Sequence, residues 1–227
     1  MARKYVNLTD KNGNKVKEAL AQLVKRDVDS AEYRIAFSVL GAELGTLINE
    51  NNSDMGKILL VCASEDADWL AKGVKDNLQK DAGLAVLWTR RIVVCDNPKI
   101  EISAIDRSYI DMVGDICDTM IVVKSIISTS CVVKSQVNYL IQRVCPKKII
   151  IAAPVMYVDA EACLLKEFPE DVSSKFSFVT FAIDDERDSK GVVLPGVGGM
   201  VYPKLGLGDA DKKNYYMPML VKERAFA

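Results

Sequence analysis

The chain has 227 residues, 49% of them hydrophobic, and its 30 basic residues nearly balance its 31 acidic ones. A chain of this length and composition can bury the core of one α/β domain. A net charge of −1 without a basic stripe argues against a nucleic-acid partner. The longest apolar runs, such as residues 149–155, are too short to cross a bilayer, so we expect no membrane span.

Histidine is absent, and the six cysteines are widely spaced without a Cys-x-x-Cys pair. The first fact excludes Ser-His-Asp and Cys-His catalysis and His-ligated zinc, and we expect no metal site. The second favours a soluble protein in a reducing interior, such as the cytoplasm or an organelle stroma, over a disulfide framework. The first residues contain no apolar signal stretch and no Arg/Ser-rich amphipathic stretch, so no targeting signal is expected.

Residues 1–54 predict a helical N-terminal extension. Apolar residues at positions 16, 20, 23 and 24 share one face of a helix predicted over residues 15–25. Asp29 or Ser30 is a good N-cap for a second helix that continues to about Glu50. The run Asn-Asn-Ser-Asp at residues 51–54 is expected to end that helix.

From residue 58 onward, short apolar runs alternate with amphipathic stretches. The apolar runs predict strands over residues 58–62, 84–87, 92–95, 120–123, 148–153 and 176–183, with a turn at residues 96–98. The amphipathic stretches predict helices over residues 65–79, 132–144 and 159–167; positions 133, 137, 140, 141 and 144 are expected to face the core. This alternation is typical of a parallel sheet with helices on both faces.

The segment after Asp184 is rich in Gly and Pro and lacks a regular period. We therefore predict that residues 184–227 form a flap and a tail over the edge of the sheet. Neither an internal repeat nor a low-complexity segment divides the chain. The expected organisation is a single domain over residues 1–227, with the helical extension at one end and the flap and tail at the other.

Residues 121–133 carry the strongest functional signal. A buried strand leads into a polar loop, and a helix begins near Val132. Backbone N–H groups and the positive end of a helix dipole then point at one spot, which favours a phosphate. The segment resembles the phosphoribosyl-diphosphate signature of type I phosphoribosyltransferases, in which an apolar strand, two acidic residues and a Thr-Gly-Gly-Ser/Thr loop follow one another.

Further segments resemble the uracil phosphoribosyltransferase family. Residues 147–154 continue the motif into another apolar strand, and residues 57–73 are similar to the family's first strand, pyrophosphate loop and helix. Residues 181–186 and 191–199 resemble the strand that ends in an acidic turn and the Pro-Gly-x-Gly-Asp flap that binds the base. The resemblance implies a type I phosphoribosyltransferase fold, with strand 120–123 central and the Thr129 loop at its C-terminal edge.

The resemblance also implies three groups of site residues, each a remnant of the family's site. The phosphate- and ribose-binding group is Lys124, Ser125, Ser128, Thr129, Ser130 and Cys131. The base-binding group is Pro195, Gly196, Val197, Gly198 and Gly199. The pyrophosphate-loop group is Ala63, Ser64, Glu65 and Asp66.

Each group departs from the family's pattern. Lys124 and Ser125 replace the acidic pair, and Ser130 and Cys131 replace glycines that let the backbone approach a phosphate. The pyrophosphate loop gains carboxylates, and the flap has a glycine at its final Asp position. The acidic pair favours a cation-like sugar carbon. A unit charge about 5 Å from this carbon, at a dielectric constant of about 20, changes its energy by about 3 kcal/mol. Replacing a negative charge by a positive one therefore raises the barrier by about 6 kcal/mol, which slows the reaction by about four powers of ten.

Structural explanations compete with these functional ones. Lys124 pairs with a carboxylate such as Asp115 or Asp118, or binds an anion itself. The acidic loop at residues 63–68 is otherwise an ordinary N-terminal turn of a helix, where Asp and Glu are favoured. Cys131 is more simply a packed thiol than a nucleophile, because no histidine base exists. Arg90 and Arg91 contact a phosphate or are solvated.

The first hypothesis is a uracil phosphoribosyltransferase-like protein without catalytic residues that serves as a binding, regulatory or structural subunit, with no assured cofactor. The second is an active enzyme that converts uracil and phosphoribosyl diphosphate to UMP and pyrophosphate with Mg²⁺. The third is a sensor that binds a nucleotide or phosphoribosyl diphosphate without turnover. The retained Thr129 and the flap glycines favour the second hypothesis.

We expect an assembly, either a homodimer, as the resemblance implies, or a larger complex. The tail is rich in aromatic, Leu and Met residues, which favour a contact surface unless they cover the sheet's own edge.

Overall fold

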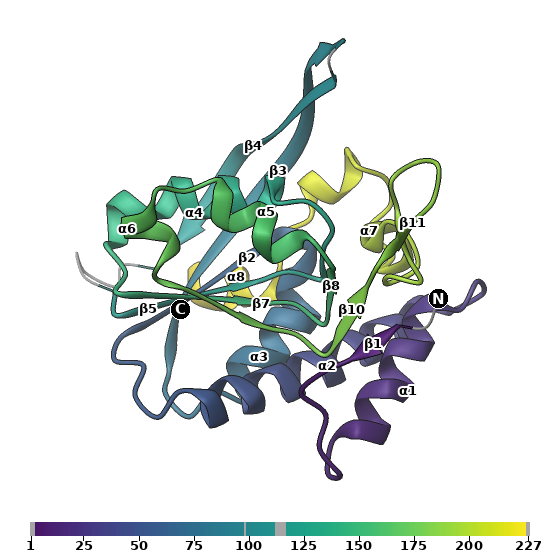
Figure 1. Ribbon diagram of the computed structural model, residues 1–227, viewed down its shortest axis with the longest axis horizontal. Coiled ribbons are helices and arrows are strands. Elements are labelled where there is room, and N and C mark those ends of the chain that lie inside the picture. The colour runs from purple at the N-terminus through teal and green to yellow at the C-terminus, as the bar shows by residue number, and fades with distance from the viewer. Residues whose placement is uncertain (1–2, 98, 112–116, 226–227) are drawn as a thin grey trace.

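The computed structural model describes residues 3–97, 99–111 and 117–225. Its centre is a six-stranded sheet in the order β4-β3-β2-β5-β7-β9 (Figure 1). The strands are β2 (Ile58–Ala63), β3 (Ala82–Asp96), β4 (Lys99–Ile110), β5 (Thr119–Val123), β7 (Lys148–Ala152) and β9 (Phe176–Val179). All neighbouring pairs are parallel except β3 with β4. The predicted fold class is confirmed, and β5, the motif strand, lies between β2 and β7.

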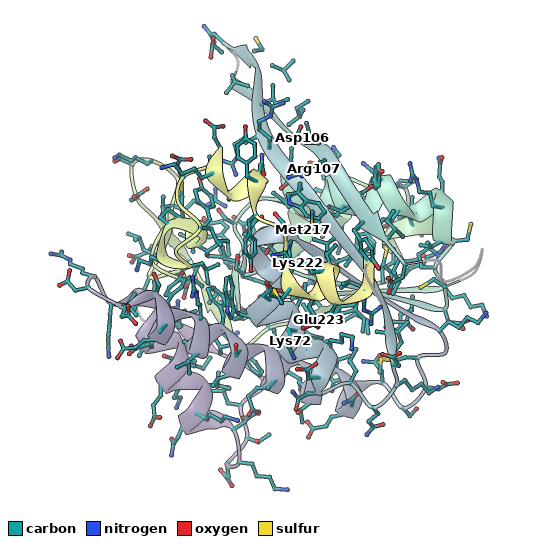
Figure 2. All side chains as sticks on the ribbon, turned by 180° about the vertical axis from the view of Figure 1, so that it is seen from behind. Lys72, Asp106, Arg107, Met217, Lys222 and Glu223 are labelled. Carbon is teal, nitrogen blue, oxygen red and sulfur yellow. The ribbon has the colours of Figure 1, made fainter. Side chains whose placement is uncertain are left out.

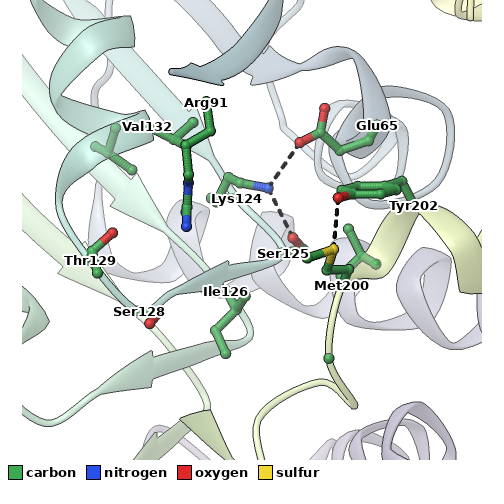
Figure 3. Close-up of a pocket in the computed structure, with 13 residues that line it drawn as sticks. Glu65, Arg91, Lys124, Ser125, Ile126, Ser128, Thr129, Val132, Met200 and Tyr202 are labelled. Atoms are coloured by element: carbon green, nitrogen blue, oxygen red, sulfur yellow. Dashed lines mark hydrogen bonds and ion pairs between the residues drawn. The ribbon is translucent and has the colours of Figure 1, made fainter. Parts of the chain in front are cut away.

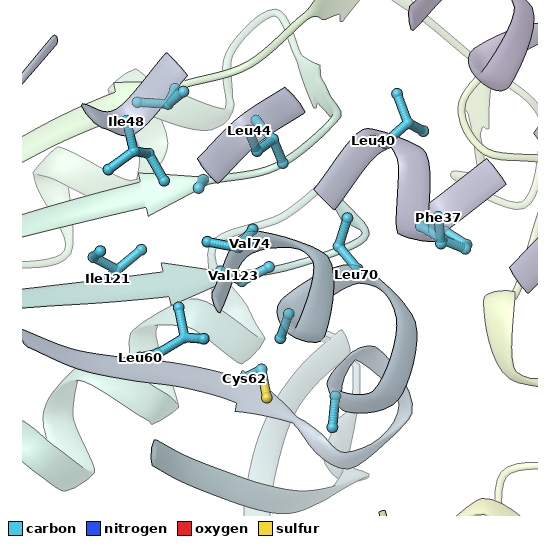
Figure 4. Packing of buried hydrophobic residues seen from close by; sticks show 14 of the residues in the cluster. Phe37, Leu40, Leu44, Ile48, Leu60, Cys62, Leu70, Val74, Ile121 and Val123 are labelled. Carbon is cyan, nitrogen blue, oxygen red and sulfur yellow. The ribbon is translucent and has the colours of Figure 1, made fainter. Parts of the chain in front are cut away.

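The central strands are buried on both faces, which explains their uninterrupted apolar sequences. Along β5, Ile121 and Val123 pack in one core with helices α2 and α3, while Met120 and Val122 pack in a second core with helix α4. These helices are α2 (Ser30–Asn51), α3 (Lys72–Asp76) and α4 (Cys131–Val144). Figure 4 shows the first of these cores.

The N-terminal helices agree with the prediction. α1 (Gly13–Val24) buries one apolar face, and α2 begins after Asp29, whose carboxylate accepts a hydrogen bond from the N–H of Ala31 at 3.0 Å. α2 packs closely on the π turn η2 (Ala67–Ala71) and on α3 because glycines meet there: a Cβ on Gly41 would lie 2.2 Å from the carbonyl oxygen of Leu70 in η2 and 3.1 Å from Cα of Gly73 in α3. That distance excludes a side chain at this point unless the helices separate.

A smaller sheet, β1-β10-β8-β6, carries the chain beyond the C-terminal ends of the central strands. It consists of β1 (Lys4–Tyr5), β10 (Ala182–Asp184), β8 (Val155–Tyr157) and β6 (Ile126–Ile127). The strand predicted over residues 176–183 is therefore wrong as a single element, since β9 and β10 belong to different sheets. The break falls at Thr180, whose hydroxyl bonds to the carbonyl oxygens of Pro154 and Ala182 and turns the chain.

Two other predictions are corrected by the structure. The strands expected over residues 84–87 and 92–95 are one 15-residue strand, β3, which forms a hairpin with the unpredicted strand β4. The helix expected over residues 65–79 is instead a 3-10 turn η1 (Ser64–Asp66), a π turn η2 (Ala67–Ala71) and the short α3. The side chains of Asp66 and Asp68 draw this loop toward distant partners, described below, and prevent a regular helix start. Pro98, in the predicted turn, lies outside the described residues.

The remaining helices cover the sheet and the flap. They are α5 (Ala160–Lys166), α6 (Glu170–Ser173), α7 (Val201–Lys204), η3 (Lys212–Tyr215) and α8 (Met219–Ala225), and the flap adds the two-stranded pair β11 (Glu186–Arg187) and β12 (Val193–Leu194). In α4 the structure buries Gln136 fully and leaves Ile141, expected to face the core, only partly buried. Within the described ranges, no helix has both the length and the apolar composition that crossing a membrane requires.

Candidate functional site

A pocket of about 180 Å³ lies at the C-terminal end of β5 (Figure 3). The loop after β5, the first turn of α4 and the segment that follows the flap surround it. Its walls are formed by Glu65, Arg91, Lys124, Ser125, Ile126, Ser128, Thr129, Val132, Val133, Gly199, Met200, Val201 and Tyr202. The pocket occupies the sheet edge at which open α/β proteins bind ligands.

Lys124 lies buried between two carboxylates of the β2–α3 loop. Its ammonium is 2.5 Å from Oδ2 of Asp66 and 3.6 Å from Oε1 of Glu65, and it donates to Oγ of Ser125 at 3.0 Å. The N–H of Ser125 donates to the other oxygen of Asp66 at 3.2 Å. The loop after β2 and the loop after β5 are thus joined directly by charge.

Lys213, from η3 in the tail, joins the same cluster. Its ammonium is 3.2 Å from Oε2 of Glu65 and donates to the carbonyl oxygen of Thr89 at 2.9 Å. Two buried lysines therefore face two buried carboxyl groups.

The cluster changes the protonation of its members. Burial alone lowers the pKa of Lys124, but the attraction of Asp66 and Glu65 outweighs it, so the pKa lies above the usual lysine range. Burial raises the pKa of Glu65, but Lys124 and Lys213 outweigh it and hold that pKa below the usual range. Lys124 is therefore an ammonium at neutral pH and Glu65 a carboxylate.

Lys124 pairs with a carboxylate, as one of the structural explanations predicted, but its described partners do not include the predicted Asp118. Asp118 is 2.8 Å from the ammonium of Lys147 at the opposite end of β5. Asp115 lies outside the described residues. Glu65 and Asp66, which the sequence assigned to a different part of the site, are the partners.

The phosphate-loop residues separate into two groups. Ser128 and Thr129 line the pocket, whereas Ser130 donates to the carboxylate of Glu167 at 3.2 Å. Lys134, one turn into α4, also pairs with Glu167. Cys131 begins α4 and is not among the residues that line the pocket.

The flap is held from behind by the N-terminal segment and α2. Arg3 pairs with buried Asp184 at 2.8 Å and donates to the carbonyl oxygen of Gly196, whose N–H donates to Asp184 at 2.8 Å. The hydroxyl of Tyr33 donates to the carbonyl oxygen of Val197 at 2.8 Å. Three backbone groups of the predicted base-binding segment are therefore engaged inside the protein.

Most residues of the predicted base-binding and pyrophosphate-loop groups lie around the pocket without lining it. Gly199 lines it, and Pro195, Gly196, Val197 and Gly198 do not. Gly198 has φ of 81°, and a Cβ there would lie 2.5 Å from the carbonyl oxygen of Leu23. In the pyrophosphate-loop group only Glu65 lines the pocket; Ala63 and Ser64 are fully buried beneath it.

The tail crosses the acidic loop on the side shown in Figure 2. The carboxylate of Asp68 accepts hydrogen bonds from the hydroxyl of Tyr216 and from the N–H groups of Met219, at 2.8 Å, and Leu220, at 3.0 Å. The ring of Tyr216 stacks on Trp69 at 6.1 Å between centroids. Each acidic residue of the loop thus has a partner within the protein.

The site also contains residues that the sequence did not place there. Tyr202 and Met200 form one wall, and Lys213 closes the charge cluster from 148 positions away along the chain. Arg91, suggested as a possible phosphate contact, lines the opposite wall (Figure 3). Of these four residues, only Arg91 could be connected with the site from the sequence, because it follows an apolar run.

Magnesium does not fit the acidic loop. Mg²⁺ takes carboxylate oxygens and retains several waters, whereas Glu65 and Asp66 already bind lysine ammonium groups in a buried cluster. Within the described part of the chain, no group of three or more Cys, Asp or Glu side chains could hold a metal ion.

No family model and no curated protein matches the sequence. Among solved structures, the AQ2163 protein from Aquifex aeolicus is 13% identical, with a TM-score of 0.69 over 88% of this chain and 96% of that chain. This likeness shows the fold alone.

Two further solved structures are similar over a smaller part of the chain. A hypothetical protein from Neisseria gonorrhoeae with bound ppGpp is 11% identical, covers 66% of this chain and 80% of its own, and has a TM-score of 0.48. A hypoxanthine-guanine phosphoribosyltransferase from Bacillus anthracis is 13% identical, covers 55% of this chain and 68% of its own, and has a TM-score of 0.39. Both TM-scores are too low to establish a shared fold.

Proposed function

We propose that the chain is a phosphoribosyltransferase-like protein that has lost glycosyl transfer and serves as a binding, regulatory or structural subunit. The observation that carries the proposal is the ammonium of Lys124, buried 2.5 Å from Asp66 where the family has an acidic pair. A fixed positive charge at this point opposes a cation-like sugar carbon.

The acidic loop supports the same proposal. Glu65 and Asp66 are engaged by Lys124 and Lys213, so a bound pyrophosphate would have to replace existing ion pairs. Breaking a buried ion pair by removing one partner costs about 3–5 kcal/mol. That cost would be subtracted from the binding free energy of any substrate that needs this loop.

The flap supports the loss of base binding. Family members recognise the pyrimidine edge mainly through backbone groups of the flap. Here the N–H and C=O of Gly196 and the C=O of Val197 are bound to Asp184, Arg3 and Tyr33. A uracil ring would find these groups already satisfied, and opening them would leave buried polar atoms without partners.

Calorimetric titration of the full chain with phosphoribosyl diphosphate and Mg²⁺ tests this proposal. We expect no saturable heat at millimolar ligand. Tight binding without turnover would instead favour the sensor hypothesis, for which the hydroxyls of Ser128 and Thr129 in the pocket wall are the supporting observation.

We also propose that the chain works as a homodimer and that the β3–β4 hairpin contributes to the contact. Beyond Trp88, β3 pairs with β4 alone among the described strands, and the hairpin projects from the body as a two-stranded arm (Figure 1). Its exposed apolar residues are Ile92, Val93, Val94 and Ile102. An open strand edge with apolar side chains favours pairing with another chain.

The tail supports assembly less strongly than its composition suggested. Leu205 and Leu220 are buried, and Tyr216 is packed against Trp69. Tyr215 and Met219 remain exposed. Most of the tail therefore covers its own domain, and the arm provides the larger apolar surface.

A further inference from the structure

The pocket differs in chemistry from a site for a sugar phosphate. Its apolar wall consists of Ile126, Val132, Val133, Met200, Val201 and the ring of Tyr202. A sugar exposes hydroxyl groups that need polar partners, and burying them against apolar side chains without hydrogen bonds is costly. The wall instead suits a planar apolar body.

The pocket is partly open to solvent, and the space that it encloses matches a body of one ring. Pockets for drug-sized ligands have volumes of about 300–1,000 Å³, whereas this pocket has about 180 Å³. An engineered apolar cavity of about 150 Å³ holds benzene. A single aromatic ring with one small substituent therefore matches the space.

Among the polar groups of the pocket, Arg91 favours an anionic substituent, and the carboxylate of Glu65, which also lines the pocket, is already paired with Lys124 and Lys213. Arg91 extends from β3 into the wall opposite Tyr202 (Figure 3), and its guanidinium has five N–H donors, so it can bind a carboxylate while keeping another partner. The hydroxyls of Ser128 and Thr129 line the same space. The single charge of Lys124 is already matched by Glu65 and Asp66, so the wall does not offer the concentrated positive charge that a diphosphate needs.

We propose that this pocket binds a small planar organic anion, one aromatic or heteroaromatic ring that carries one carboxylate. The ring lies between Tyr202, Met200 and Val132, and the carboxylate binds Arg91. The inference rests on the proposed function, since it assigns a new ligand class to a site that no longer binds phosphoribosyl diphosphate.

Titration of the full chain with benzoate, followed by ligand-observed NMR and calorimetry, tests the inference. We expect saturable binding of benzoate and weaker binding of acetate, which lacks the ring, and of benzyl alcohol, which lacks the charge. Ribose 5-phosphate should bind more weakly than benzoate. Absence of benzoate binding at millimolar concentration, or stronger binding of ribose 5-phosphate, would overturn the inference.

Adjacent arginines provide a matched pair of variants. Arg91→Gln should weaken benzoate binding about tenfold, the effect of losing one charge-assisted hydrogen bond. Arg90→Gln should leave it unchanged, because Arg90 pairs with Asp106 at 3.4 Å and does not line the pocket. Equal effects of the two variants would contradict the assignment.

A second pair of variants tests whether the ligand binds in this pocket. Val132→Phe fills the pocket from the first turn of α4, and Asn138→Phe adds the same ring on the exposed side of that helix. Only Val132→Phe should abolish binding, with circular dichroism confirming that both variants fold. Binding that survives in Val132→Phe would place the ligand elsewhere.

The inference and the proposed function fail in different ways. Conversion of uracil and phosphoribosyl diphosphate to UMP would refute the loss of catalysis, whatever benzoate does. Absence of both turnover and benzoate binding would overturn the inference alone.

Discussion

The positive charge of Lys124 is compensated by carboxylates within the protein, and this gives the residue a structural role. Its partners, Asp66 and Glu65, are themselves buried, and Lys213 compensates the second carboxylate from the far side. In such a cluster each member is costly to remove, because its partner is left as an unpaired buried charge. Lys124 therefore helps to hold the loops of the site together.

Lys124→Met should lower the free energy of unfolding by about 3–5 kcal/mol, because it leaves the carboxylates of Glu65 and Asp66 with one ammonium fewer. Urea unfolding measures the change. The deficit should shrink as the pH falls below neutrality, since protonation removes the uncompensated negative charge.

Lys134→Met is the matched control. Lys134 pairs with Glu167, and 40% and 37% of these two side chains are exposed. Loss of such a surface pair costs less than about 1 kcal/mol. Equal destabilisation by the two variants would show that burial adds nothing to the Lys124 pair.

The residues of the site were predictable only where the signal is local. Lys124 was found from its place after an apolar strand, and Thr129 from the loop that follows it. The Glu65–Lys213 pair spans 148 positions and depends on the path of an aperiodic tail, so nothing in the local sequence indicates it. Tyr202 enters the wall for the same reason.

At the scale of elements, loops and termini restrain one another. Arg3 in the N-terminal segment holds Asp184 and Gly196 of the flap, and Arg187 of β11 donates to the carbonyl oxygen of Ser128 at 2.5 Å. Asp68 holds the start of α8. The periodic strands and helices were predicted because each buries a regular face. β4 was missed because it forms most of its contacts with β3 in an arm away from the core.

Gly41→Ala tests the close crossing of α2 with η2 and α3. Alanine is the better helix former by about 1 kcal/mol, yet its Cβ would meet the carbonyl oxygen of Leu70 at 2.2 Å. We expect a net destabilisation of about 1–3 kcal/mol from the forced separation of the helices, measured by thermal unfolding. Thr46→Ala, at an exposed position of the same helix, should not destabilise the protein. A stabilised Gly41→Ala variant would contradict the crossing.

For the whole molecule, several buried groups hold their protons more tightly than they would in the unfolded chain. Burial raises the pKa of Cys62 well above the usual thiol range and that of Cys117 to about 11. Burial, together with the charge of Asp66, raises the pKa of Tyr33. When the pH is below the pKa values that these groups have in the unfolded chain, they stabilise the folded state. This stabilisation is lost as the pH rises toward the higher pKa values of the folded state.

We therefore expect stability to fall once the pH exceeds about 8.5, where thiols of the unfolded chain ionise, by about 1.4 kcal/mol per pH unit for each buried thiol. Urea midpoints measured under reducing conditions across this range give the slope. Cys62→Ala should flatten it, whereas Cys145→Ala, at an exposed position, should not. A stability that rises with pH in this window has the wrong sign for this explanation.

The proposed homodimer is a property of the whole molecule that sedimentation can measure. Val94 is 60% exposed on the arm, and Ile35 is 64% exposed on α2. If the arm forms the contact, Val94→Lys should shift the protein to monomer at micromolar concentration, because a charge would be buried against a partner. Ile35→Lys should leave the protein dimeric. A wild-type monomer without a co-purifying partner would refute the assembly.

The proposed loss of glycosyl transfer is tested most directly by incubating the purified full chain with uracil, phosphoribosyl diphosphate and Mg²⁺ and measuring UMP. With the ammonium of Lys124 at 2.5 Å from Asp66, at the position where type I phosphoribosyltransferases have an acidic pair, we predict no UMP above the level of a protein-free control. Robust formation of UMP that is lost in a Thr129→Val variant would contradict the account, because it would show that this pocket still performs the transfer.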